Sequence, residues 1–147
     1  LVDVLEKLKP ESETSLDKSL RAHSATCPSG AIQILISDLM DPEGVESAFR
    51  QIPGVRGESW LIHLLSQSEA QPDLQGDLRL VDSERQEHVD VTMTTSVLKA
   101  YQSALSQFRE EIRDHCRRYK IQPVEVSTLV PFDQVVLDVL RQKRWLS

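Results

Sequence analysis

The 147-residue sequence lacks the features that mark membrane, secreted and nucleic-acid-binding proteins. No apolar run approaches the roughly 20 residues needed to span a bilayer, and the N-terminus does not resemble a signal peptide. The formal net charge is -6. This balance disfavours nucleic-acid or anionic-lipid partners, because both need concentrated positive charge. We therefore expect a cytoplasmic protein with neither nucleic acid nor membrane as its partner.

Metal-binding and redox motifs are also scarce. Cys27 and Cys116 are the only cysteines, and they do not form a C-x-x-C motif. We expect reduced thiols, with a Cys27–Cys116 disulfide as the less favoured alternative. The four histidines show no metal-ligand spacing, and His63, in an apolar run, is expected to be a core residue. Composition and length suit one globular domain over residues 1–147. Because the first residue is Leu1 and not Met, we expect a fragment, a processed product or a cloned piece.

The hydrophobic pattern predicts an α/β fold. Nearly continuous apolar runs at residues 31–36 and 59–65 predict two strands buried on both faces, as in a parallel sheet. The segment between them carries a helix pattern after residue 42, so the three elements form a βαβ unit. Residues 122–127 predict a third, short strand.

Further elements are expected around this unit. Helices are predicted for residues 1–9 and 15–25, and a polar loop for residues 66–76. Alternating apolar residues between 78 and 91 predict a β-hairpin. Pro131 is expected in the first turn of a last amphipathic helix. A long helix from about residue 95 to residue 119 has an inner stripe of Leu98, Tyr101, Leu105, Phe108, Ile112, Cys116 and Tyr119.

The main candidate for chemistry is Ser37-Asp38, directly after the first predicted strand. In an open parallel sheet, functional groups gather just past the carboxyl ends of the strands. A carboxylate there can bind a hard cation such as Mg²⁺. The alternative is that Asp38 and Asp41 only cap the following helix, since Asp is favoured at that position.

Several segments together resemble a known family. They are Ile-Ser-Asp-Leu-Met-Asp-Pro-Glu-Gly at 36–44, His-Leu-Leu-Ser at 63–66, Gly-Asp-Leu-Arg-Leu-Val-Asp-Ser-Glu at 76–84, Glu-Ile-Arg-Asp-His-Cys-Arg-Arg at 111–118 and Val-Ser-Thr-Leu-Val-Pro-Phe at 126–132. Their order and spacing resemble the bacterial von Willebrand factor type A (VWA)-like family catalogued as domain of unknown function fifty-eight. The resemblance covers nearly the whole chain. It implies a partial VWA-like, Rossmann-like parallel sheet flanked by helices, with an inserted β-hairpin.

The resemblance also implies a metal site. Thr14 and Asp38 resemble two parts of the metal-ion-dependent adhesion site of VWA domains. The first part of that site, Asp-x-Ser-x-Ser, would lie upstream of Leu1, which makes this chain the C-terminal part of the domain. Ser15 stands where the family usually has Asp. We therefore expect Mg²⁺ in the full-length protein, bound with the help of Asp38 and Thr14, and none in this fragment.

Three functions follow as hypotheses. The resemblance implies a protein-interaction module that acts with a MoxR-type AAA+ ATPase in complex assembly or metal insertion, without catalytic residues. The alternatives are an Mg²⁺-dependent phosphate-handling enzyme that uses Asp38 and Asp41, and a structural domain with an inactive ion site. A missing upstream strand would also leave an open edge, and unpaired edges tend to pair with another chain. This predicts a homodimer through residues 31–37.

Overall fold

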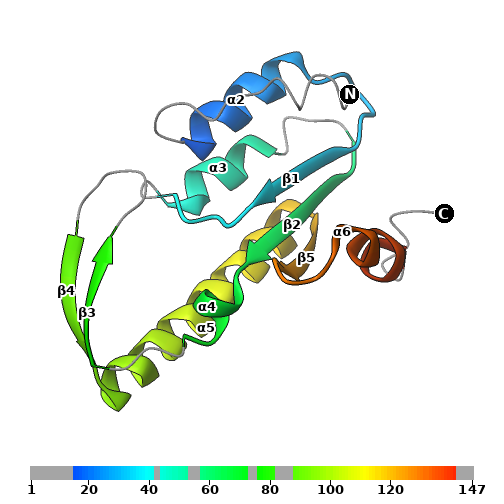
Figure 1. Ribbon diagram of the computed structural model, residues 1–147. Helices are drawn as coiled ribbons and strands as arrows, with labels where there is room; N and C mark the ends of the chain where they lie inside the picture. The colour runs from blue at the N-terminus through cyan, green and yellow to red at the C-terminus, as the bar shows by residue number, and fades with distance from the viewer. Residues whose placement is uncertain (1–14, 42–43, 53–56, 73–75, 82–87, 142–147) are drawn as a thin grey trace.

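The computed structural model describes residues 15–41, 44–52, 57–72, 76–81 and 88–141 (Figure 1). The predicted α/β class is confirmed. The helix expected at residues 1–9 lies outside the described residues. In chain order the elements are α2 (Leu16–Thr26), β1 (Gln33–Ser37), α3 (Val45–Gln51), β2 (Ser59–Leu65), α4 (Gln67–Ala70), β3 (Gly76–Val81), β4 (His88–Met93), α5 (Thr95–Tyr119), β5 (Ile121–Ser127), α6 (Phe132–Gln134) and the π-helix η2 (Val135–Leu140).

The main sheet has three parallel strands in the order β1-β2-β5, so that β2 lies in the middle. Ile34 lies beside Trp60, and Ile62 lies beside Val124. The predicted βαβ unit is formed by β1, α3 and β2, and the chain returns to the sheet as β5 after the long helix α5. Because the strands are parallel, their carboxyl ends meet at one edge of the sheet.

Three helices, α2, α3 and α5, cover one face of the sheet. They bury a core in which Ala48, Phe49 and Leu61 have no exposed surface. The predicted helix at 95–119 is confirmed, with its N-terminus capped by the Thr94 hydroxyl, which accepts the Val97 amide. The cluster on this face comprises Leu16, Leu20, Leu39, Val45, Ala48, Phe49, Ile52, Leu61, Ile112, Cys116 and Ile121.

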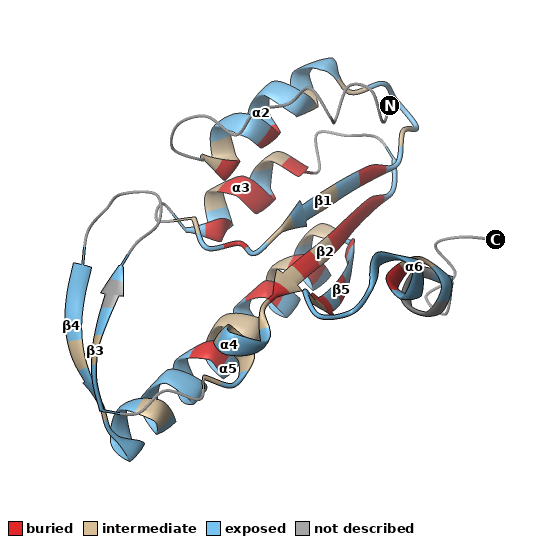
Figure 2. Cartoon of the chain, in the orientation of Figure 1, coloured by how far each residue is buried: buried red, intermediate tan, exposed pale blue. Residues whose placement is uncertain are grey.

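The opposite face is only partly covered. Trp60, Val124 and Val126 pack against Val135 of η2. At β1, however, Ile32, which precedes the strand, and Ile34 and Ile36 within it are 55%, 49% and 61% exposed. Figure 2 colours parts of β1 as exposed. The prediction that residues 31–36 are buried on both faces is therefore wrong, whereas β2 is buried or half-buried along its whole length. The C-terminal helical segment contacts β2 and β5 in this cluster, and the cluster includes no residue of β1.

The peripheral elements agree with the sequence in most respects. The predicted hairpin is confirmed as the antiparallel pair β3–β4, with Leu78 beside Val91 and Leu80 beside Val89. Both cysteines are free, as expected. Among the helices that the structure describes, none is long and apolar enough to cross a membrane.

Two local expectations were wrong. The predicted polar loop at 66–76 contains α4, because Ser66 and Glu69 form a reciprocal capping box around its first turn. The last helix is not a regular α-helix: α6 continues directly into the π-helix η2, and Pro131 occupies the N-cap instead of the first turn.

Substitution of two phenylalanines by alanine should affect stability very differently, because one side chain is buried and the other is exposed. Phe49 is fully buried and its ring stacks on that of His115 at a centroid distance of 5.4 Å. Phe49→Ala should therefore lower the free energy of unfolding by about 3–5 kcal/mol in urea titrations. Phe132→Ala serves as the control, because Phe132 is 81% exposed, and should change stability by less than about 0.5 kcal/mol. Equal losses for the two variants would contradict this packing.

Candidate functional site

The turn after β1 presents Asp38 to solvent. Leu39 follows with a φ of 61°, in the left-handed region that branched side chains rarely adopt, and only 1% of the residue is exposed. Its amide donates to the Ser37 Oγ at 3.0 Å, and the Met40 amide donates to the Asp38 Oδ1 at 3.1 Å. The buried leucine and these two hydrogen bonds hold the turn, so the exposed Asp38 carboxylate has a defined position.

Asp41 connects the same turn to the start of α2. Its Oδ2 accepts the Leu16 amide at 2.7 Å. A carboxylate is favoured at a helix N-terminus, because amide groups point at it there and the helix dipole is positive. The Asp41 side chain thus contacts the first turn of α2, and the alternative that Asp38 and Asp41 cap the following helix stays a prediction. Thr14, two residues before Leu16, lies outside the described residues.

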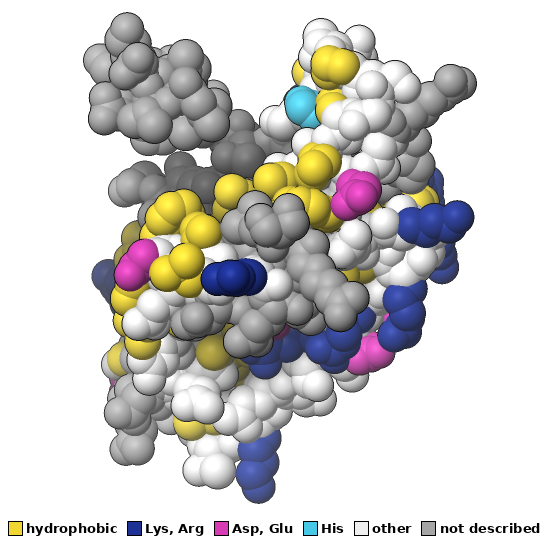
Figure 3. All heavy atoms as spheres, turned by 90° about the vertical axis from the view of Figure 1, so that its right-hand side faces the viewer, with side chains coloured by type: hydrophobic (Ala, Val, Ile, Leu, Met, Phe, Trp, Pro, Cys, Tyr) yellow, Lys and Arg dark blue, Asp and Glu magenta, His cyan; other side chains and the backbone are white. Residues whose placement is uncertain are grey.

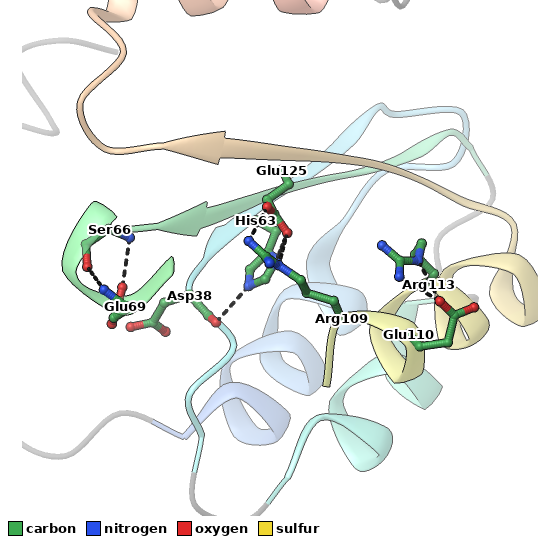
Figure 4. A network of polar contacts seen from close by, with 8 residues as sticks. All are labelled: Asp38, His63, Ser66, Glu69, Arg109, Glu110, Arg113 and Glu125. Atoms are coloured by element: carbon green, nitrogen blue, oxygen red, sulfur yellow. Dashed lines mark hydrogen bonds and ion pairs between the residues drawn. The ribbon is translucent and has the colours of Figure 1, made fainter. Parts of the chain in front are cut away.

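His63, in the central strand β2, contacts the backbone of the same turn. Only 3% of the residue is exposed, as expected of a core histidine. Its Nε2 lies 3.2 Å from the Asp38 carbonyl oxygen, and its Nδ1 lies 3.7 Å from the Glu125 Oε2 (Figure 4). Because a carbonyl oxygen can only accept, the Nε2 carries the proton of the neutral ring. The backbone next to the Asp38 side chain is thus fixed to the middle of the sheet.

An ion pair extends this network to α5. The Arg109 guanidinium donates twice to the Glu125 carboxylate, at 2.9 and 2.8 Å, and so joins α5 to β5. Arg109, Arg113 and Glu125 line a cavity of about 260 Å³ beside His63. Arg113 is itself paired with Glu110 (Figure 4). Since carboxylates already neutralise both guanidinium groups, the cavity is a poor site for an anion.

The carboxyl end of β2 carries a third carboxylate, Glu69. Its Oε2 accepts the Ser66 amide at 2.8 Å, and the hydrogen bonds to Ser66 lower its pKa below the usual value. The Tyr101 hydroxyl donates to the Glu69 carbonyl oxygen at 2.8 Å and ties α4 to α5. Glu69 is thus engaged as a helix cap at this end of the sheet.

The described residues do not make up a complete Mg²⁺ site. Mg²⁺ requires near-octahedral coordination by oxygen, and within the described ranges no group of three or more His, Cys, Asp or Glu residues could hold a metal ion. The Asp38 carboxylate is exposed, and like those of Asp41 and Glu69 it accepts a backbone amide. The Ser37 and Ser66 hydroxyls also accept backbone amides.

Sequence reasoning located only part of this site. It placed Asp38 at the end of a strand, and the structure shows it there. It missed the contacts of Asp41 with Leu16 and of Arg109 with Glu125, which join residues 25 and 16 positions apart in the sequence. No local pattern marks such pairs.

The fold and the site define an α/β protein that presents the exposed Asp38 carboxylate at the carboxyl end of a parallel sheet. The sequence profile of the family described as "Protein of unknown function DUF58" matches residues 1–111. The chain belongs to this family, as the segments at 36–44, 63–66 and 76–84 predicted. No curated protein and no solved structure matches the chain significantly.

Because His63 is buried, we expect the free energy of unfolding to decrease as the pH falls. Burial lowers the pKa of His63 below 6.5, while the carboxylate of Glu125 and the hydrogen bond to Asp38 act in the opposite direction. The unfolded chain therefore binds the proton first as the pH falls. This contribution to stability is complete above about pH 6.5 and decreases from there down to the folded-state pKa.

His63→Gln should remove this part of the pH dependence, because an amide can still donate to the Asp38 carbonyl but does not titrate. The measurement is urea unfolding at several values between about pH 8 and pH 5. His88→Gln, which changes an exposed histidine of β4, should leave the parent's pH profile unchanged. If the stability of the parent and that of His63→Gln changed with pH in the same way, the contribution assigned to His63 would be wrong.

Proposed function

We propose that this chain is a VWA-like protein-interaction module that binds its partner at the carboxyl end of the sheet, around Asp38. One observation carries the proposal. The backbone of the exposed Asp38 is fixed by two buried neighbours, because Leu39 follows it in the chain and His63 lies at hydrogen-bond distance from its carbonyl oxygen. A charge fixed on a rigid scaffold suits recognition, because its position does not have to be ordered again on binding.

The contact between Asp41 and Leu16 supports the same location. It brings the start of α2 to the turn that follows Asp38. In the resemblance to VWA domains, Thr14 and Asp38 belong to one ion site, and Thr14 precedes Leu16 by two residues. The resemblance also implies Mg²⁺ at this site. The proposal includes the ion only if further oxygen ligands come from residues outside the described ranges or from the partner.

The partner that we propose is a MoxR-type AAA+ ATPase, with a role in complex assembly or metal insertion. This identity rests on the family resemblance. The enzymatic alternative has less support, because the Oδ2 of Asp41, its second carboxylate, already accepts the Leu16 amide. The geometry favours binding over hydrolysis.

Asp38→Ala should weaken binding of the MoxR-type ATPase at least about tenfold, which corresponds to about 1.4 kcal/mol. Isothermal titration calorimetry, with and without Mg²⁺, measures this on the protein that contains the chain. The matched control is Asp133→Ala, an exposed carboxylate at the start of α6, which should bind like the parent. Hydrolysis of a phosphate ester that Asp38→Ala abolishes would contradict the proposal and support the enzyme.

A further inference from the structure

The imidazole of His63 lies between two oxygens that can accept its proton. Its Nε2 is 3.2 Å from the Asp38 carbonyl oxygen, and its Nδ1 is 3.7 Å from the Glu125 Oε2 (Figure 4). A neutral ring carries its proton on one nitrogen, and the other nitrogen can only accept. The position of this proton therefore decides which of the two oxygens the ring can bind.

The Glu125 carboxylate is the stronger competitor for the proton, because hydrogen bonds to charged groups are shorter and stronger than those between neutral groups. With the proton on Nδ1, the Nε2 lone pair would face the Asp38 carbonyl oxygen, and two acceptors cannot bind each other. Yet the 3.7 Å between Nδ1 and Oε2 exceeds the length of a hydrogen bond. Another group must therefore hold the carboxylate away from the ring.

That group is Arg109, which occupies the oxygen facing His63. Its Nε donates to the Glu125 Oε2 at 2.9 Å, and its Nη2 donates to Oε1 at 2.8 Å. The Oε2 thus lies between the guanidinium and the imidazole. Two parallel hydrogen bonds fix the orientation of a carboxylate as well as its position, so Glu125 does not turn toward Nδ1.

Arg109 differs from the arginines that follow it on α5. Its side chain is 28% exposed, against 51% for Arg113 and 69% for Arg117. These two pair with Glu110 and Asp114 of their own helix. Figure 3 shows Lys and Arg side chains at the surface along one side of the face that it displays, and ion pairs in solvent contribute little. The Arg109 pair instead joins α5 to β5 beside a buried ring.

We propose that Arg109 is a positioning residue, which holds Glu125 and thereby keeps the His63 proton on Nε2. That proton binds the Asp38 carbonyl and fixes the turn of the proposed binding site. When Arg109 is lost, the ring gives up the proton on Nε2 and takes one on Nδ1, without a change in charge, and the turn is released. The inference rests on the proposed function only in its consequence for the partner.

Carbon-13 NMR of the His63 ring distinguishes the two neutral tautomers and tests the proposal directly. At about pH 8, where the ring is neutral, the parent should carry the proton on Nε2. Arg109→Met removes the donors but keeps an apolar side chain. It should raise the ratio of Nδ1-protonated to Nε2-protonated rings at least about tenfold, because the freed carboxylate is the better acceptor. Comparison with His63→Gln identifies the His63 signals among the four histidines.

A second substitution separates positioning from packing. In Arg109→Met/Glu125→Met the competing carboxylate is also absent, so the proton should return to Nε2 as in the parent. A purely structural role of Arg109 predicts the reverse, because loss of a second partner would loosen the site further. Arg113→Met is the matched control, since Arg113 lines the same cavity but is paired with Glu110, and it should keep the parent tautomer.

Circular dichroism checks that each variant folds. Arg109→Gln also lacks the charge, should raise the ratio in the same direction, and replaces Arg109→Met if that variant does not fold. A parent-like tautomer in the folded Arg109 variant would overturn the proposal. So would a double variant that keeps its proton on Nδ1.

Binding of the MoxR-type ATPase separates this inference from the function proposed above. Arg109→Met should weaken binding at least about fivefold, and Arg109→Met/Glu125→Met should restore it. If the parent does not bind the ATPase although Arg109→Met moves the proton, the proposed function is wrong and the role of Arg109 stands. If the parent binds and the proton does not move, the role of Arg109 is wrong and the proposed function stands.

Discussion

The hydrogen bond from His63 to the Asp38 carbonyl is the interaction on which the carboxyl end of the sheet depends. A buried imidazole without partners would cost about 1–3 kcal/mol, so its surroundings must provide them. Here the turn that follows β1 supplies the acceptor, and Glu125 of β5 lies beside the other ring nitrogen. Arg109 in turn binds Glu125 and brings in α5. One buried side chain thus joins all three parallel strands and the longest helix.

The sheet itself is asymmetric. Three helices close one face, and that core holds the largest fully buried side chains, among them Phe49 and Leu61. The other face is closed over β5 by η2 and open over β1, where three isoleucines remain in water. An edge strand that carries two of these isoleucines is therefore the least covered strand of the sheet.

The sequence predicted well those elements whose side-chain pattern is set by the local geometry of a strand or a helix. Apolar runs and helical spacing predicted β1, β2, β5 and α5, because each side-chain pattern follows directly from strand or helix geometry. It was uninformative where distant segments decide the outcome. The exposure of Ile34 depends on where the C-terminal segment packs, and the role of Asp41 depends on the placement of α2. Thr14, predicted as a ligand, lies outside the described residues and remains a prediction.

The central claim is that His63 positions Asp38 for partner recognition, and two substitutions at one position test it. His63→Gln retains a donor for the Asp38 carbonyl, whereas His63→Phe keeps a ring but has none. The measurement is the affinity of both variants for the MoxR-type ATPase, with folding checked by circular dichroism. The account predicts near-parent binding for His63→Gln and a loss approaching that of Asp38→Ala for a folded His63→Phe. Parent-like binding by His63→Phe would contradict it.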